Sequence, residues 1–299
     1  MRWRTASAGA FVVAAFGIAL FSLMDALMKH LALAIGAYDA LLWRHVGAIP
    51  VSGLLYFPRW RGWPGPTAMR LHLVRGAVST VMAWLFFWAL TVVPMAQAIA
   101  LAFIAPLISL FLAALILKER ISRTTIAASF LAFAGVSVIL VGQMKADLGS
   151  AALLGSAAVL ASALCYAWNI ILMRQQAQIA APEEVAFFQN VIMGVGFALV
   201  APWLAHVPAI EHVPALVGVA LLATAALMLL GWAYARAEAN QLASAEYTAF
   251  IWAALLGWLV FDEQVSLATL MGAAMIVTGC VASARQGRNG IVHVETATI

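Results

Sequence analysis

Apolar stretches of about 20 residues follow one another along almost the whole chain, separated by short clusters of charges, prolines and polar residues. A helix of that length crosses the hydrocarbon core of a bilayer. Runs such as AASFLAFAGVSVILV do not alternate between apolar and polar residues, as the strands of a membrane β-barrel do. We therefore predict an all-α integral membrane protein with ten transmembrane helices, near residues 8–28, 38–57, 72–91, 95–117, 124–142, 151–173, 184–204, 214–235, 243–261 and 266–284.

Composition agrees with this interpretation. Hydrophobic residues make up 65% of the chain, charged residues 9%, and the mean hydropathy is +1.01. A soluble domain carries about 25% charged residues, so a water-soluble globular protein is excluded. No small-residue cleavage pattern follows the first apolar run, which predicts a retained helix. Cys165 and Cys280 fall inside predicted helices, where we expect buried thiols and no disulfide.

Lysine and arginine predict the orientation. With the amino terminus in the cytoplasm, twelve of these residues fall on the inner side, and only Lys29 and Lys145 fall on the outer side. Both termini, residues 1–7 and the tail 285–299, are therefore predicted to be cytoplasmic in a multi-pass inner (plasma) membrane protein. The sequence pI of about 9.4 reflects this bias and does not indicate a nucleic-acid partner.

One phrase occurs twice, as LKERIS at 117–122 and as FDEQVS at 261–266. The offset of 144 residues pairs Glu119 with Glu263 and maps the first five predicted helices onto the last five. Because five is odd, the second copy enters the membrane from the opposite side. We predict two inverted five-helix repeats, residues 8–142 and 151–284, around a central cavity, an arrangement typical of secondary transporters. The same offset pairs Trp88 with Trp232, Gln97 with Gln241 and Gly135 with Gly279.

These phrases carry a family resemblance. LKERIS followed by FAGVSVILVG, and FDEQVS followed by MGAAMIVTGCVAS, resemble the drug/metabolite transporter superfamily, in particular its ten-helix exporters and permeases with two EamA-type repeats. The resemblance covers nearly all of residues 8–284. It implies a monomer or weak homo-oligomer in membrane lipid that moves a small-molecule substrate by alternating access. Aromatic and neutral amino acids are the substrate class that we expect first; nucleosides, sugars, S-adenosylmethionine and drug-like solutes are the alternatives.

Polar side chains within the predicted helices are the candidates for contact with the substrate. A charge at the bilayer centre costs at least about 2.5 kcal/mol, so it usually faces a partner or a water-filled cavity. In the first repeat these residues are Asp25, Arg44, His45, Arg75 and Gln97, and in the second they are Asn169, Gln189, Asn190, Glu246 and Tyr247.

Arg44 is the first candidate, because its rigid fork can hold a carboxylate through two parallel hydrogen bonds. The alternatives are an ion pair with Asp25 or a side chain extended to the outer headgroups. Asp25 has an alternative of its own, a pair with Lys29 one helical turn away.

Two residues are candidates for proton coupling. His45 could titrate near neutral pH, although a hydrogen bond between helices would explain it equally well. Glu246 lies deeper in the second repeat than the loop acids, and the alternative is that it simply faces the cytoplasm.

Aromatic side chains could line the cavity, or could anchor helices at the headgroups. The aromatic candidates, with one threonine on the same helix face, are Thr80, Trp84, Trp88, Trp168, Tyr247 and Trp252. Pro106 lacks an N–H, so we expect a kink in the fourth helix near mid-membrane and a hinge there. Its counterpart is Phe250, which makes the fourth helix the expected bending element.

Enzymatic function is not indicated. The six histidines are scattered and no pair has metal-binding spacing on a helix, so we predict no catalytic residue, metal or cofactor. HVPAIEH at 206–212 is interpreted as a solvated connector. No ATP-binding motif occurs, which leaves facilitated or gradient-driven transport. Glu119 and Glu263 are predicted on opposite faces, each stabilising the turn into a helix that begins near Ser122 or Ser266.

Overall fold

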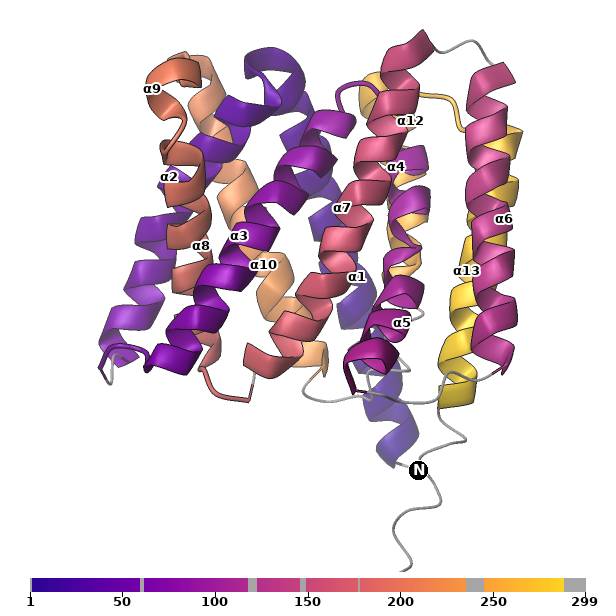
Figure 1. Cartoon of the computed structure of the whole chain (residues 1–299). Helices are drawn as coiled ribbons and strands as arrows, with labels where there is room; N and C mark the ends of the chain where they lie inside the picture. Colours follow the sequence, from indigo (N-terminus) through magenta and orange to yellow (C-terminus); the bar gives the residue numbers. More distant parts are fainter. Residues whose placement is uncertain are drawn as a thin grey trace, which may run out of the picture.

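The computed structural model describes residues 2–59, 62–117, 123–145, 149–176, 178–234 and 245–287. These residues form helices lying side by side, with no strand among them, which confirms the predicted all-helical class (Figure 1). In chain order the elements are α1 (Arg2–Ile35), α2 (Ala37–Tyr56), η1 (Phe57–Arg59), α3 (Pro66–Ala89), α4 (Met95–Ala102), α5 (Ala105–Leu117), α6 (Arg123–Lys145), α7 (Gly149–Gln176), α8 (Pro182–Ala198), α9 (Ala201–Leu204), η2 (Ile210–His212), α10 (Val213–Tyr234), α12 (Thr248–Phe261) and α13 (Leu267–Gly287).

The helices carry apolar side chains on the outside as well as between them. Leu54, Phe130 and Leu221 are 76%, 74% and 65% exposed, so the outer surface needs lipid around it. Within the described part of the chain, 4 helical segments are long and apolar enough to cross a membrane: 9–35, 66–89, 150–173 and 210–230. Shorter apolar helical segments are 95–109, 126–142, 248–261 and 267–282. The protein is therefore a membrane protein.

Several helix ends differ from the predicted ones. α1 extends to Ile35, seven residues beyond the predicted end, and Lys29 within this extension pairs with Glu263 inside the protein. α3 begins at Pro66, six residues early, with the proline in the first turn, where a missing N–H costs nothing. α8 ends at Ala198, and the short α9 follows it. The predicted start of the ninth helix at 243 lies outside the described residues.

The fourth predicted helix is interrupted near Pro106. α4 ends at Ala102 and α5 begins at Ala105, with a turn at Phe103 and Ile104. The thiol of Cys280 donates a hydrogen bond to the carbonyl of Phe103 at this turn, at 3.2 Å. The interruption lies where we expected a kink, whereas the role of Pro106 as a hinge stays a prediction.

A second break occurs at the equivalent position of the other repeat. A turn at Tyr247 precedes α12, and Tyr247 stands 144 residues after Phe103. The two rings meet edge to face, with centroids 5.4 Å apart. We expected the two repeats to differ here, with the fourth helix as the bending element, whereas the structure shows a turn in both repeats. The second break forms without a proline, which indicates that the contact between the repeats contributes to both breaks.

The packing of the helices repeats itself under the same offset. α1 packs on α10, and in the same way its counterpart α7 packs on α3. α1 also packs on α12, and α7 packs on α4 and α5. The pairs α2–α8 and α6–α13 each join one helix to its own counterpart, and α4 packs on α12, which lies in the ninth predicted helix, the counterpart of the fourth. α6 and α13 lie together at one side of the bundle, and α2 and α8 lie at the other (Figure 1). The two halves are thus related by an approximate twofold axis.

Small residues hold α6 against α13. A Cβ atom on Gly272 would lie 2.5 Å from the carbonyl oxygen of Gly135, and one on Gly279 would lie 2.6 Å from that of Ala128. The offset maps the first contact onto the second. Lipid offers no hydrophobic drive for association, so close backbone approach supplies the attraction. We call this contact the α6–α13 seam.

The α6–α13 seam generates a prediction. Gly272→Ala should lower the thermal unfolding temperature of the purified protein, because the new methyl group would overlap backbone across the seam, an overpacking that costs about 1–3 kcal/mol. Gly47→Ala is the matched control, since nothing lies within 4 Å of a Cβ there. Equal unfolding temperatures for the two variants would contradict the close approach.

Candidate functional site

Arg44 and Asp25 form the charged part of the candidate site. Arg44 on α2 places its guanidinium 5.9 Å from the ring centroid of Phe87 on α3, a cation–π contact. Asp25 on α1 interacts electrostatically with Arg44. The two groups nevertheless form no ion pair within 4.0 Å, and within the described part of the chain no other carboxylate does so with Arg44. A carboxyl group and a guanidinium therefore interact here without a direct ion pair.

His45 and Asn190 lie next to this charged pair, where α2 crosses α8. The Nδ1 atom of His45 is 3.3 Å from Oδ1 of Asn190, and the imidazole stacks on Phe197 with centroids 5.8 Å apart. This is the hydrogen bond between helices that we considered for His45. Among the described residues, Nε2 of His45 and Oε1 of Gln189 are buried without a hydrogen-bond partner. His45 and Gln189 are equivalent under the offset, so both repeats place a spare polar atom at the same crossing.

The remaining predicted polar residues lie in separate contacts between helices. Gln97 donates to Ser156 at 3.3 Å, which joins α4 to α7. Thr80 donates to the Gly76 carbonyl within its own helix and packs its methyl group against the position of Gly196. Each of these side chains has a structural reason for its place.

The aromatic residues do not gather in one wall. Trp84, Trp88 and Trp168 are 50%, 39% and 42% exposed, and Trp252 is half-buried beside a small apolar cluster. Tyr247 meets Phe103 at the helix breaks described above. Glu246 is exposed and interacts electrostatically with Tyr166 and Tyr247.

Lys29 and Glu263 form a buried ion pair toward the ends of α1 and α12. The ammonium also donates to the Val93 carbonyl at 3.0 Å, and the second carboxylate oxygen accepts from the Met95 backbone N–H at 2.8 Å. Lys29 therefore pairs with the other repeat, and the alternative of an Asp25–Lys29 pair is wrong. The reason is distance along the chain, because the partner is 234 residues away and a local helical rule cannot identify it.

The turn at Glu263 also differs from the prediction. Glu263 stabilises the start of α4, in the other repeat, rather than the start of α13. Ser266 does serve the start of α13, because its hydroxyl accepts from the Thr269 backbone N–H at 3.1 Å, which confirms that part of the prediction. Glu119 and Ser122 lie outside the described residues.

A second polar network joins α3 to α7 and α8 on the side where α1 begins, which we call the N-terminal face (lower side of Figure 1). Arg75 donates through Nε to Asn169 at 2.9 Å and through Nη1 to Gln176. Gln176 contacts His72 at 2.6 Å, and His72 contacts Glu184 at 2.9 Å. We call these five residues the Arg75 network.

The sequence contains a signal for the Arg75 network that polar residues taken singly do not give. His72, Arg75 and Ser79 lie at i, i+3 and i+7 on α3, and Asn169 and Gln176 lie at i and i+7 on α7. Both spacings place polar groups on one helix face. We predicted Arg75 and Asn169 as polar positions within spans and missed His72, Gln176 and Glu184.

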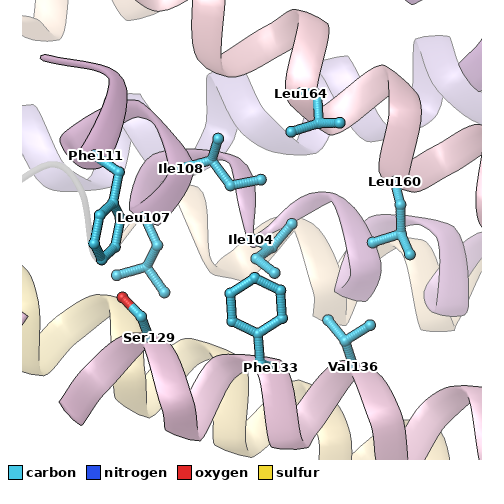
Figure 2. A pocket seen from close by; sticks show the side chains of 9 residues that line it. All are labelled: Ile104, Leu107, Ile108, Phe111, Ser129, Phe133, Val136, Leu160 and Leu164. Carbon is cyan, nitrogen blue, oxygen red and sulfur yellow. The ribbon is translucent and has the colours of Figure 1, made fainter. Parts of the chain in front are cut away.

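Two of the cavities among the described residues lie apart from the predicted site, since none of the predicted site residues lines either of them. The first, of about 410 Å³, lies between α5, α6 and α7 and is apolar apart from the Ser129 hydroxyl (Figure 2). The second, of about 810 Å³, opens at the N-terminal face. Its lining includes two acids of α8, an arginine and two aromatic residues: Glu183, Glu184, Arg59, Tyr56 and Trp63.

The connector that contains HVPAIEH is attached to α2. Asp39 accepts from the His206 backbone N–H at 3.0 Å and lies 3.2 Å from its Nδ1, while Trp43 donates to the His206 carbonyl at 2.9 Å. Within the described ranges, no group of three or more His, Cys, Asp or Glu side chains is placed to hold a metal ion.

The fold and the polar contacts between the two halves define a class of membrane transporter. The chain belongs to the EamA-like transporter family, whose sequence pattern matches residues 8–141 and 153–285. The resemblance to the drug/metabolite transporter superfamily is thereby confirmed.

Curated relatives agree with this family. A Helicobacter pylori protein described as an uncharacterized transporter is 26% identical over 201 residues, 64% of this chain, and the chain spans 65% of that relative's length. The pseudopaline exporter CntI of Pseudomonas aeruginosa is 25% identical over 270 residues, covering 89% of this chain and 92% of the exporter. A solved crystal structure with 21% identity has a TM-score of 0.59 over 94% of this chain and 99% of its own, which shows the fold.

The Lys29–Glu263 pair generates a prediction. Lys29→Met should strongly lower thermal stability, because removing one partner of a buried ion pair costs about 3–5 kcal/mol. The side chains of Lys29 and Glu263 are 5% and 15% exposed. Arg59→Met breaks the exposed pair with Glu183 and is the control, with an expected cost of at most about 1 kcal/mol. If thermal melts give the two variants equal losses, the buried pair does not hold α1 to α12.

Proposed function

We propose that this protein is a secondary transporter of amino acids, with aromatic and neutral ones first, across the inner membrane. Ten transmembrane helices in two inverted repeats, residues 8–142 and 151–284, would alternate access to a central site. Both termini would lie in the cytoplasm, so that the N-terminal face is the cytoplasmic one. Family membership and the approximate twofold packing support the transport class.

The observation that carries the substrate class is the pair of opposite charges at Arg44 and Asp25, which are not directly paired. An amino acid is a zwitterion and could neutralise both charges at once. Its carboxylate would take the guanidinium fork of Arg44, and its ammonium would approach Asp25. Phe87 already faces Arg44, and Phe197 faces His45, so an aromatic side chain would find apolar surface beside the charges.

The neighbouring polar atoms extend this site. Nε2 of His45 and Oε1 of Gln189 have no hydrogen-bond partner among the described residues, and a substrate could supply one in a conformation that opens the α2–α8 crossing. Their equivalence under the offset fits a mechanism in which the two repeats exchange conformations around one site. The paired helix breaks at Phe103 and Tyr247 supply bending points in both halves.

The test uses purified protein in liposomes preloaded with tryptophan, its decarboxylated analogue tryptamine, and a panel of neutral amino acids. We expect export of tryptophan in preference to tryptamine. Arg44→Ala should reduce tryptophan transport about ten- to hundredfold, the value of a lost charge-assisted hydrogen bond of about 1.5–3 kcal/mol. The same variant should remove the preference over tryptamine, because that preference would come from the carboxylate.

Arg59→Ala, an exposed arginine at the N-terminal face, is the matched control and should transport as the wild type does. Size-exclusion chromatography checks that each variant is folded. A folded Arg44→Ala variant that still prefers tryptophan would rule out carboxylate recognition by Arg44. Failure of the wild type with amino acids, nucleosides, sugars, S-adenosylmethionine and pseudopaline alike would count against the transporter itself.

Pseudopaline is included because one relative is named as its exporter. Transport of pseudopaline but of no amino acid would contradict the proposed substrate class, and the proposed transport mechanism would still hold.

A further inference from the structure

The Arg75 network forms a continuous polar path from the N-terminal face into the bundle. Glu184 in the first turn of α8 lines the cavity of about 810 Å³, and His72 lies behind it, stacked on Phe188 with centroids 4.8 Å apart. The side chain of Glu184 is 19% exposed, whereas that of His72 is 0% exposed. Water therefore reaches the carboxylate and not the imidazole.

Arg75 fixes the direction of every hydrogen bond in this path. A guanidinium only donates, so the atom of Gln176 that faces it is the oxygen, and the amide nitrogen of Gln176 faces His72. In the same way Asn169 accepts from Arg75 and donates to Ser79 at 2.8 Å. Neither amide can turn round without placing N–H groups against the arginine.

The direction of these hydrogen bonds determines the tautomer of His72. The amide nitrogen of Gln176 donates, so Nδ1 of His72 must be the bare acceptor. The ring proton is therefore on Nε2, which donates to the Glu184 carboxylate at 2.9 Å. His72 and Glu184 together hold one proton, and each hydrogen bond of the path then has one donor and one acceptor.

A second proton cannot bind to the His72–Glu184 pair without breaking one of these hydrogen bonds. A second proton on the ring can bind only at Nδ1, because Nε2 already carries the proton donated to Glu184. An N–H there would face the N–H groups of Gln176 at a separation of 2.6 Å between the two nitrogens. Turning the Gln176 amide would relieve this conflict and create another with Arg75. One of the two hydrogen bonds of Gln176 must be lost.

The charged groups around His72 come from each neighbouring element. α8 contributes Glu184 and Glu183, and η1 contributes Arg59, which lies 4.0 Å from Glu183. On its own helix Arg75 is joined to it through the Gln176 amide, and Arg70 is exposed. On α7 the side chain of Arg174 lies outside the described residues.

The equivalent interface of the other repeat has no such path. Under the offset, His72 and Arg75 correspond to Leu216 and Val219 on α10, and Gln176 corresponds to Ala32 on α1. Val219 and Ala32 are 0% and 3% exposed in an apolar contact. Among the described residues the His72–Glu184 pair is thus not repeated at the matching positions, where Leu216 and Ala40 stand, although Asn169 corresponds to the carboxyl group of Asp25 on α1. A proton acting at His72 and Glu184 alone can bias a symmetric two-state mechanism.

We propose that His72 and Glu184 form a proton-binding site that opens to the N-terminal face, and that its second proton breaks the contact of Gln176 with Arg75 and releases α7 from α3. The coupling of this step to transport rests on the proposed function. The proton comes from the water in the cavity at Glu184, and returns there when the path re-forms.

The first experiment needs no transported substrate. Protein with ring-labelled ¹⁵N histidine is placed in lipid nanodiscs, and its resonances are assigned with His72→Gln. In its singly protonated form we expect His72 as the Nε2–H tautomer. As the pH is lowered stepwise, amide exchange at residues 170–176 should rise together with the signal of the doubly protonated ring. An Nδ1–H tautomer, or a protonated ring with unchanged exchange, would overturn the proposal.

The second experiment measures coupling with a matched pair of variants. Glu184→Gln removes the carboxylate that admits the proton, and Glu183→Gln changes the adjacent acid, which faces Arg59 instead. A pH difference of one unit should drive about tenfold accumulation of tryptophan for one coupled proton. We expect about tenfold for the wild type and Glu183→Gln, and accumulation near onefold for Glu184→Gln and His72→Gln.

Exchange of labelled for unlabelled tryptophan, measured without a gradient, separates the two proposals. Exchange by the wild type without gradient-driven accumulation overturns the coupling and leaves the transporter standing. No exchange of tryptophan or of any other solute tested removes the proposed function, and the resonances of His72 still decide the proton site. If His72→Gln does not fold, Glu184→Gln still tests gradient-driven accumulation against the wild type. His30→Gln, on the exposed surface of α1, is the histidine control.

Discussion

Inside a bilayer, a polar group must find its partner within the protein, because lipid tails offer none. In this chain the helices meet that requirement for the backbone, and the polar side chains meet it largely by reaching across to the other repeat. Lys29 binds Glu263, Arg75 binds Asn169 and Gln176, His45 contacts Asn190, and Asp39 holds the His206 segment. Polar contacts thus fix how the two halves sit against each other, while glycine and alanine allow their backbones to approach.

The exceptions to the twofold arrangement bear on function. The α6–α13 seam is nearly self-equivalent, and so are the helix breaks at Phe103 and Tyr247, as a scaffold with two interchangeable conformations requires. The α3–α7 contact is different, because it is charged where its counterpart α1–α10 is apolar. In the proposed mechanism the equivalent halves would provide alternation, and the proton site at His72 and Glu184 would provide a direction.

Sequence reasoning succeeded where the signal is periodic and failed where the partner is remote. The apolar runs and the duplicated phrase predict helices, a repeat and the family, because burial in lipid constrains every residue of a span. Ser266 was predicted at the start of a helix because that interaction is local. Lys29 was assigned to the wrong acid, since nothing local identifies Glu263. His72 was passed over as one of several scattered histidines, although its spacing to Arg75 and Ser79 places all three on one face.

The central claim is that two inverted repeats alternate between conformations open to opposite sides. Distances between spin labels test it directly, with Cys165 and Cys280 first replaced and labels placed at exposed positions. One pair, Trp63 and Gln178, lies at the N-terminal face, and its equivalent under the offset is Val207 and Ala34 at the opposite face. The account predicts that a transported amino acid shifts the two distance distributions in opposite senses, one pair approaching as the other separates. Two distributions that stay unchanged, or that move in the same sense, would contradict it.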